Sequence, residues 1–139
     1  MSKQTTSEYM LLFRGSDWHK GLSPEEIQQV VTQMYAWFDR LTKEGKLKAG
    51  QPLEFEGKIV SQKKGRSVVD GPFAESKEAI AGYFLLQLNS FDEAVEIAKD
   101  YPALNYGATV EVRPVAPECS LNQIVRQKNA EEELARANA

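Results

Sequence analysis

Two helix-start signatures constrain the fold of this chain more than any other feature of its sequence. Ser23-Pro24-Glu25-Glu26 and Ser90-Phe91-Asp92-Glu93 each place a capping serine three residues before a glutamate. With this spacing the serine and the glutamate can each bond the other's backbone amide. Both signatures follow a run rich in apolar, strand-forming residues, Tyr9–Arg14 and Ala79–Asn89. The sequence therefore predicts two units in which a strand is followed by a helix.

The first helix is predicted to run from about Pro24 to Glu44. Its apolar residues recur at three- and four-residue steps, and Gly45 can adopt the left-handed conformation that ends a helix. The second helix is shorter and stops before Tyr101-Pro102, because the residue before a proline disfavours helical geometry.

Further strands are predicted between and after the two helices. Leu53–Glu56 alternates apolar and acidic residues and is predicted as an edge strand. Lys58–Ser61 and Ser67–Asp70 are predicted to form a β-hairpin around the turn Lys63-Lys64-Gly65. The last strand is predicted at Thr109–Val115.

The resulting order, β-α-β, an inserted hairpin and a second β-α-β, predicts an α+β ferredoxin-like sandwich of the split type, with strand order 4-1-3-2. Both faces are apolar in Tyr9–Arg14 and in Ala79–Asn89, as expected for central strands, whereas the other two strands have one polar face each. Both helices would cover the same side of the sheet. The other apolar side needs a cover, and we expect a homodimer formed sheet against sheet with closed twofold symmetry.

Length and composition set the remaining limits. The 139 residues fit one globular domain, expected at residues 1–117, and a tail at residues 118–139 that is Ala- and Glu-rich and can be helical. The chain has 17 Lys and Arg residues and 20 Asp and Glu residues, which gives a formal net charge of −3, and its basic residues form no stripe. We therefore expect no nucleic-acid partner.

We also expect no bound cofactor, no metal site and no membrane-spanning segment. Cys119 is the single cysteine, so it can neither close an intrachain disulfide nor supply a zinc site with paired thiolates. Gly65 and Gly71 do not open a helix after a strand, as a dinucleotide motif requires. The run Ala79–Leu86 is far shorter than the ~20 residues of a membrane span, and Met1–Glu8 lacks the apolar core of a signal peptide. We expect a cytoplasmic protein.

The most specific motif is the run Asp70-Gly71-Pro72-Phe73-Ala74-Glu75-Ser76-Lys77-Glu78, followed by Gly82-Tyr83-Phe84 and by Val110–Val115. Together with Tyr9–Leu12 and Leu22–Glu26, it resembles the DGPF branch of the YCII-related proteins over about Glu8 to Val115. This resemblance implies a dimeric α+β barrel with a ferredoxin-like fold.

The same resemblance implies two kinds of function. YCII-like proteins are often proposed to be small enzymes with a His and an Asp in a pocket beside the sheet, and at least one relative is a cofactor-free dehydrochlorinase of an aromatic compound. The DGPF branch also often occurs alongside extracytoplasmic-function sigma factors, which implies an accessory role in transcription regulation. The resemblance implies a histidine on the first helix, about eleven residues before the glycine that ends it. Eleven residues before Gly45, this chain has Met34.

Asp70 and His19 are the candidate catalytic residues. A desolvated Asp70 carboxylate could serve as a general base, although an Asp before Gly-Pro also commonly caps a turn. His19, the single histidine, could shuttle a proton if it met Asp70, or could simply pack in its loop. Arg14, Arg113 and Lys77 are candidate binding groups for an anionic substrate, with packed or solvated side chains as the alternative.

Four aromatic residues, Trp18, Tyr35, Trp37 and Phe38, are expected in the core or in a pocket wall. Two functions remain open at this point. One is a small cofactor-free enzyme or binding protein that acts on a small organic molecule through an acid–base pocket. The other is a non-catalytic ligand-binding or accessory dimer linked to sigma-factor-dependent transcription.

Overall fold

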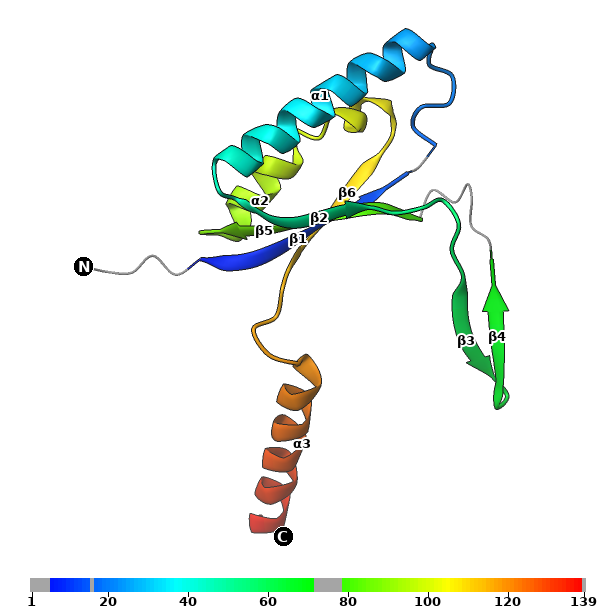
Figure 1. Cartoon of the computed structure of the whole chain (residues 1–139). Coiled ribbons are helices and arrows are strands. Elements are labelled where there is room, and N and C mark those ends of the chain that lie inside the picture. The colour runs from blue at the N-terminus through cyan, green and yellow to red at the C-terminus, as the bar shows by residue number, and fades with distance from the viewer. Residues whose placement is uncertain (1–5, 16, 72–78, 139) are drawn as a thin grey trace, which may run out of the picture.

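Four strands form an antiparallel sheet in the computed structural model, which describes residues 6–15, 17–71 and 79–138 (Figure 1). These strands are β1 (Ser7–Arg14), β2 (Leu47–Pro52), β5 (Ile80–Leu88) and β6 (Thr109–Pro114). They lie in the order β2-β5-β1-β6, which is the predicted order 4-1-3-2. The arrangement is α+β and compatible with a ferredoxin-like fold.

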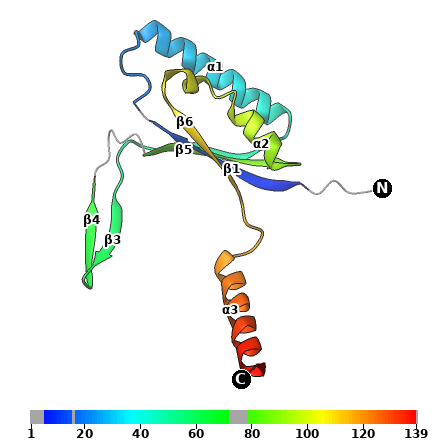
Figure 2. The same cartoon turned by 180° about the vertical axis from the view of Figure 1, so that it is seen from behind.

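Two helices cover one side of this sheet, α1 (Pro24–Lys43) and α2 (Phe91–Ala98) (Figures 1 and 2). Both predicted starts are confirmed: the Ser23 hydroxyl accepts from the Glu26 amide at 3.2 Å, and the Ser90 hydroxyl accepts from the Glu93 amide at 3.1 Å. Gly45 has a φ of 71° and follows the end of α1, as predicted. A short 3-10 helix, η1 (Pro102–Tyr106), connects α2 to β6.

The core lies between these helices and the central strands. Leu11 of β1 and Leu86 of β5 are fully buried on this side, and Leu41 of α1 packs in the same cluster. Burying one such aliphatic side chain contributes about 1.5–3 kcal/mol, so this layer supplies much of the folding free energy. On the opposite side of the sheet, Met10 of β1 lies across from Leu85 of β5, and both side chains remain partly exposed.

The predicted edge strand at Leu53–Glu56 is wrong, because the strand lies earlier in the chain. β2 begins at Leu47, directly after the helix-ending turn, and pairs with β5 as far as Pro52 opposite Gly82. After it, the Leu53 amide still donates to the Ala81 carbonyl at 2.8 Å, but residues 54–58 belong to no strand. Residues 47–52 include Gly and Pro, which strands disfavour, so tertiary pairing overrode local preference.

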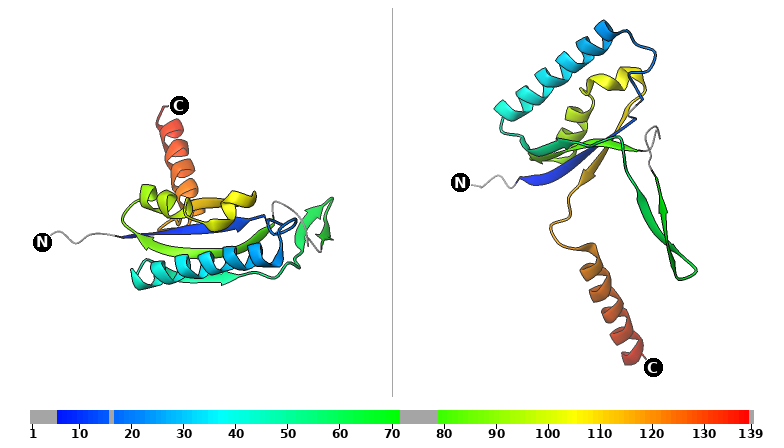
Figure 3. Two further views of the ribbon diagram at one scale, coloured as in Figure 1. Left: turned by 90° about the horizontal axis from the view of Figure 1, so that it is seen from above. Right: turned by 45° about the vertical axis from the view of Figure 1, so that its right-hand side comes forward.

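Two elements project from the side of the sheet opposite α1 and α2 (Figures 1 and 3). The first is the predicted hairpin, β3 (Ile59–Lys63) and β4 (Arg66–Asp70), whose turn residues Lys64 and Gly65 both have positive φ. The second is α3 (Ser120–Ala137), formed by the tail, in which no residue is buried. Within the described ranges, no helix combines the length and apolarity needed to cross a membrane.

Candidate functional site

An apolar pocket of about 360 Å³ lies between α1 and the β2–β5 edge of the sheet. Its walls come from α1, from β2 and β5, and from single residues of β1 and of the segment before η1. The lining residues are Phe13, Val31, Met34, Tyr35, Trp37, Phe38, Gly50, Gln51, Pro52, Ala81, Gly82, Tyr83, Phe84 and Tyr101. A hollow of this size and character is typical of small-molecule sites.

Two glycines make room for the pocket. Gly50 of β2 lies opposite Phe84 of β5, and a Cβ on Gly50 would lie 2.7 Å from the Phe84 Cδ1 atom. Gly82 is two residues before Phe84, so it lies on the same face of β5, and a Cβ there would lie 3.0 Å from the Gln51 carbonyl oxygen. Because neither position has a side chain, the sheet stays hollow beneath α1.

Aromatic rings form the deep wall of the pocket. The Phe84 ring stacks on Trp37 with centroids 5.2 Å apart, and it meets Phe13 edge-on at 4.9 Å and Phe38 at 5.7 Å. The Tyr101 ring lies 4.7 Å from Phe13 and 5.6 Å from Trp37. These contacts hold the rings in place, so the wall is formed before any ligand binds.

Polar atoms are few in this pocket, and none of the described lining residues is charged. The indole Nε1–H of Trp37 is buried and has no hydrogen-bond partner among the described residues. Burial raises the pKa of Tyr101 to about 12, so its phenol stays protonated near neutral pH and can donate a hydrogen bond. The pocket therefore suits an uncharged, largely apolar molecule with a hydrogen-bond acceptor.

A second, more polar hollow of about 420 Å³ shares Trp37 and Tyr101 with the first. It lies between α1 and η1, with Arg40, Lys99 and Asn105 in its wall. The two aromatic side chains thus stand between an apolar space and a polar one.

The structure places His19 and Asp70 outside the lining of both hollows. His19 is half-buried in the turn after β1, where its ring meets the Trp18 ring edge-on at 5.7 Å. Asp70 is exposed at the end of β4. Among the described residues, no hydrogen bond or ion pair joins the two.

Arg14 and Arg113 are brought together, with a carboxylate between them. Arg14 Nη2 donates to Glu111 Oε1 at 3.0 Å, and Arg113 Nη1 donates to Glu111 Oε2 at 3.1 Å. These bonds hold the pKa of the Glu111 carboxyl below its ordinary value, and the bond from Arg113 has a larger effect than the bond from Arg14. An anionic substrate would have to compete with Glu111. Lys77 lies outside the described residues.

Sequence analysis predicted Tyr35, Trp37 and Phe38 for the core or a pocket wall, and all three line the pocket; Trp18 does not. It missed Tyr101, which is distant in sequence from α1, and the role of Gly50. A glycine in a strand often marks a close approach or a missing side chain, and that signal was present at both glycines of the pocket. Met34, where the family resemblance implies a histidine, also lines the pocket.

No cluster of three or more His, Cys, Asp or Glu side chains suited to a metal occurs in the described ranges. A family model described as the YCII-related domain matches residues 7–118. An uncharacterised protein of Rhizobium meliloti (strain 1021) is 46% identical over 50 residues, an alignment that covers 35% of this chain and 40% of that protein. The chain thus matches well under half the length of this relative.

Proposed function

Since the chain belongs to the YCII-related family, whose domain spans residues 7–118, we propose that it binds a small, uncharged organic molecule in the pocket between α1 and the sheet. The observation that carries this proposal is the preformed aromatic wall around Phe84 and Trp37. A planar molecule would stack on these rings, and aromatic pairs of this kind contribute about 0.5–1.5 kcal/mol beyond the area they bury.

The unpaired indole N–H of Trp37 supports the same proposal. A buried donor without an acceptor costs about 1–3 kcal/mol, and an acceptor atom on a ligand would recover part of this cost after a small shift of the ring. The protonated Tyr101 phenol offers a second donor on the same wall. A carbonyl, ether or hydroxyl group on an aromatic ring has the required chemistry.

Catalysis on this molecule is the further part of the proposal, and it depends on Asp70 and His19 acting as an acid–base pair. Asp70 ends β4 and is followed by the segment that leads to β5, a strand of the pocket wall. Arg14, Arg113 and Lys77 stay candidate contacts for an anionic group only, which the uncharged molecule proposed above does not carry. The alternative is a non-catalytic binding or accessory protein in sigma-factor-dependent regulation. It is favoured by the lack of a carboxylate or imidazole among the described lining residues.

A homodimer is proposed as the working unit, in the form of a dimeric α+β barrel. The side of the sheet not covered by α1 and α2 carries Met10, Leu12, Tyr83 and Leu85, all partly exposed. A second copy of this sheet would remove these side chains from water, and closed twofold symmetry is the commonest way to do so. The proposed compartment is the cytoplasm, where the exposed thiol of Cys119 would stay reduced.

A thermal-shift screen with neutral aromatic compounds tests the binding proposal. A compound at a hundredfold excess over its Kd stabilises the folded chain by about 2.7 kcal/mol, which such a screen detects readily. Val31→Trp fills the pocket and should abolish the shift, whereas Gln29→Trp on the exposed side of α1 should keep it. A hit that binds Val31→Trp with unchanged affinity would place the site elsewhere.

Mass spectrometry of the bound compound then separates the enzyme from the binding protein. Conversion by the wild type that is lost in Asp70→Asn and in His19→Gln supports the acid–base pair. Conversion that persists in both variants removes that pair from the mechanism. A compound that is bound and recovered unchanged supports the non-catalytic alternative.

A further inference from the structure

The segment Leu53–Ser61 has the alternating pattern of a strand but lacks a strand partner along much of its length. Residues 54–58 belong to no strand, and β3, which begins at Ile59, pairs in the described part of the chain with β4 alone. Four large apolar side chains are exposed along it: Leu53 at 44%, Phe55 at 59%, Ile59 at 57% and Val60 at 68%. An exposed apolar edge of this kind is a template for pairing with another chain.

The central part of this segment, Phe55–Ile59, is complementary to itself about Gly57, whereas the outer pairs, Glu54 with Val60 and Leu53 with Ser61, are not matched. If two copies run antiparallel with Gly57 opposite Gly57, Glu56 of one copy lies opposite Lys58 of the other, and Phe55 lies opposite Ile59. Twofold symmetry makes each of these pairs occur twice. Opposite charges and aromatic–aliphatic pairs directly across two strands are both stabilising.

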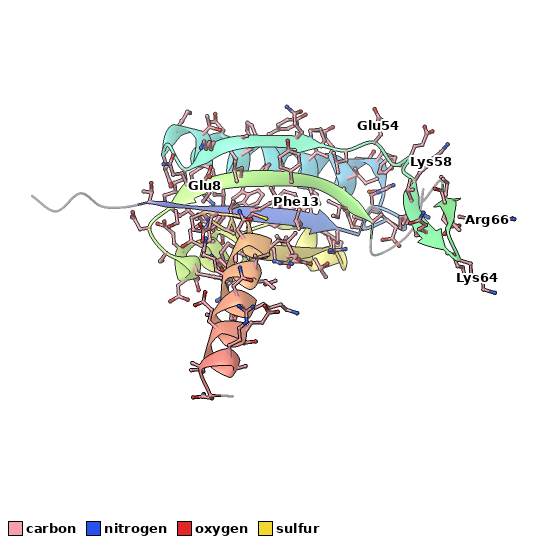
Figure 4. All side chains as sticks on the ribbon, turned by 90° about the horizontal axis from the view of Figure 1, so that it is seen from below. Glu8, Phe13, Glu54, Lys58, Lys64 and Arg66 are labelled. Atoms are coloured by element: carbon pink, nitrogen blue, oxygen red, sulfur yellow. The ribbon has the colours of Figure 1, made fainter. Side chains whose placement is uncertain are left out.

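The structure leaves these groups available for such pairing. Neither Glu56 nor Lys58 forms an ion pair within the described residues, and a Cβ placed on Gly57 would meet no atom within 4 Å. Figure 4 shows Lys58 directed away from the body of the protein, where the chain passes from the sheet to the hairpin. The hairpin itself projects toward the uncovered side of the sheet (Figures 1 and 3).

We propose that Leu53–Ser61 pairs antiparallel with the same segment of a second copy across the twofold axis, with Gly57 at that axis. This inference rests on the homodimer proposed above and specifies one of its contacts. The second copy is preferred over another partner because the two pairs nearest Gly57, Glu56 with Lys58 and Phe55 with Ile59, match in a single register. The pairing turns residues 54–58 into a strand and continues β3 across the interface.

Charge reversal tests the register. Glu56→Lys and Lys58→Glu each place like charges opposite one another at both symmetric pairs, and each should raise the dimer Kd about tenfold. The double variant Glu56→Lys/Lys58→Glu recreates both ion pairs and should return the Kd to within about twofold of the wild type. Lys64→Glu, at the tip of the hairpin, should leave the Kd unchanged.

A disulfide tests the axis directly, in a Cys119→Ser background. Gly57→Cys should crosslink two chains on mild oxidation because its Cα atoms would lie within disulfide range, whereas Gln62→Cys should not. If the wild type dimerises and every charge-reversal variant has the same Kd, this pairing is wrong, but the proposed homodimer is not contradicted. A wild type that stays monomeric at every concentration overturns both.

Discussion

Gly50→Ala should destabilise the fold by about 1–2 kcal/mol, chiefly through overlap with the Phe84 ring. The new Cβ would lie 2.7 Å from Phe84 Cδ1, which is 0.7 Å closer than the 3.4 Å at which ordinary contact begins. Phe84 cannot swing away freely, because Trp37, Phe13 and Phe38 surround its ring. Overpacking of this kind costs about 1–3 kcal/mol, and the lower entropy of the unfolded alanine chain offsets about 0.4–1 kcal/mol.

Urea unfolding followed by circular dichroism measures this difference, with Gly57→Ala as the matched control. A Cβ on Gly57 meets nothing within 4 Å in the single chain, so at protein concentrations below the dimer Kd the control should be neutral or slightly stabilised. In a Phe84→Ala background both contacts with the ring disappear and only the 3.1 Å contact with the Tyr83 carbonyl oxygen remains, so Gly50→Ala should then cost clearly less. If Gly50→Ala is as stable as the wild type, or equally destabilising without the Phe84 ring, the explanation of the pocket by its glycines is wrong.

Two further substitutions probe the helix start and the charged cluster. Ser23→Ala removes the acceptor for the Glu26 amide and should lower the free energy of unfolding by about 0.5–2 kcal/mol in the same urea assay, while Thr32→Ala, on the exposed surface of α1, should cost less. Glu111→Gln should remove an acid-sensitive contribution to stability. The folded pKa of Glu111 is depressed, so its contribution is present above the ordinary value of 4.5 and is lost as pH falls through the folded pKa. The wild type and the variant should differ most at neutral pH and converge in acid; a constant difference across a pH titration would contradict this.

Much of the fold could be predicted from local chemistry. The capping serines, Gly45 and the Lys64-Gly65 turn fix the ends of elements through their own backbone preferences, and each lies where it was expected. β2 could not be found in this way. Its residues Gly50 and Pro52 have poor strand propensity, and only pairing with β5 makes them a strand.

The pocket was less accessible to sequence analysis than the fold. Its wall joins Trp37 of α1, Phe84 of β5 and Tyr101 before η1, and no local pattern relates such distant positions. Sequence analysis instead selected two titratable residues, Asp70 and His19, as candidates. In the structure Asp70 is exposed and His19 lies in a turn. Whether they act on a substrate stays a prediction.

The sheet is a single layer of backbone, and consecutive residues of β5 point to opposite sides of it. Phe84 faces α1 and the pocket, whereas its neighbour Leu85 faces the uncovered side. A substitution of Phe84 can therefore change the pocket without changing the Leu85 side chain on the uncovered side. A substitution of Leu85 can change that side without changing the Phe84 ring. Substitutions at Phe84 and at Leu85 should therefore change different sides of the same strand.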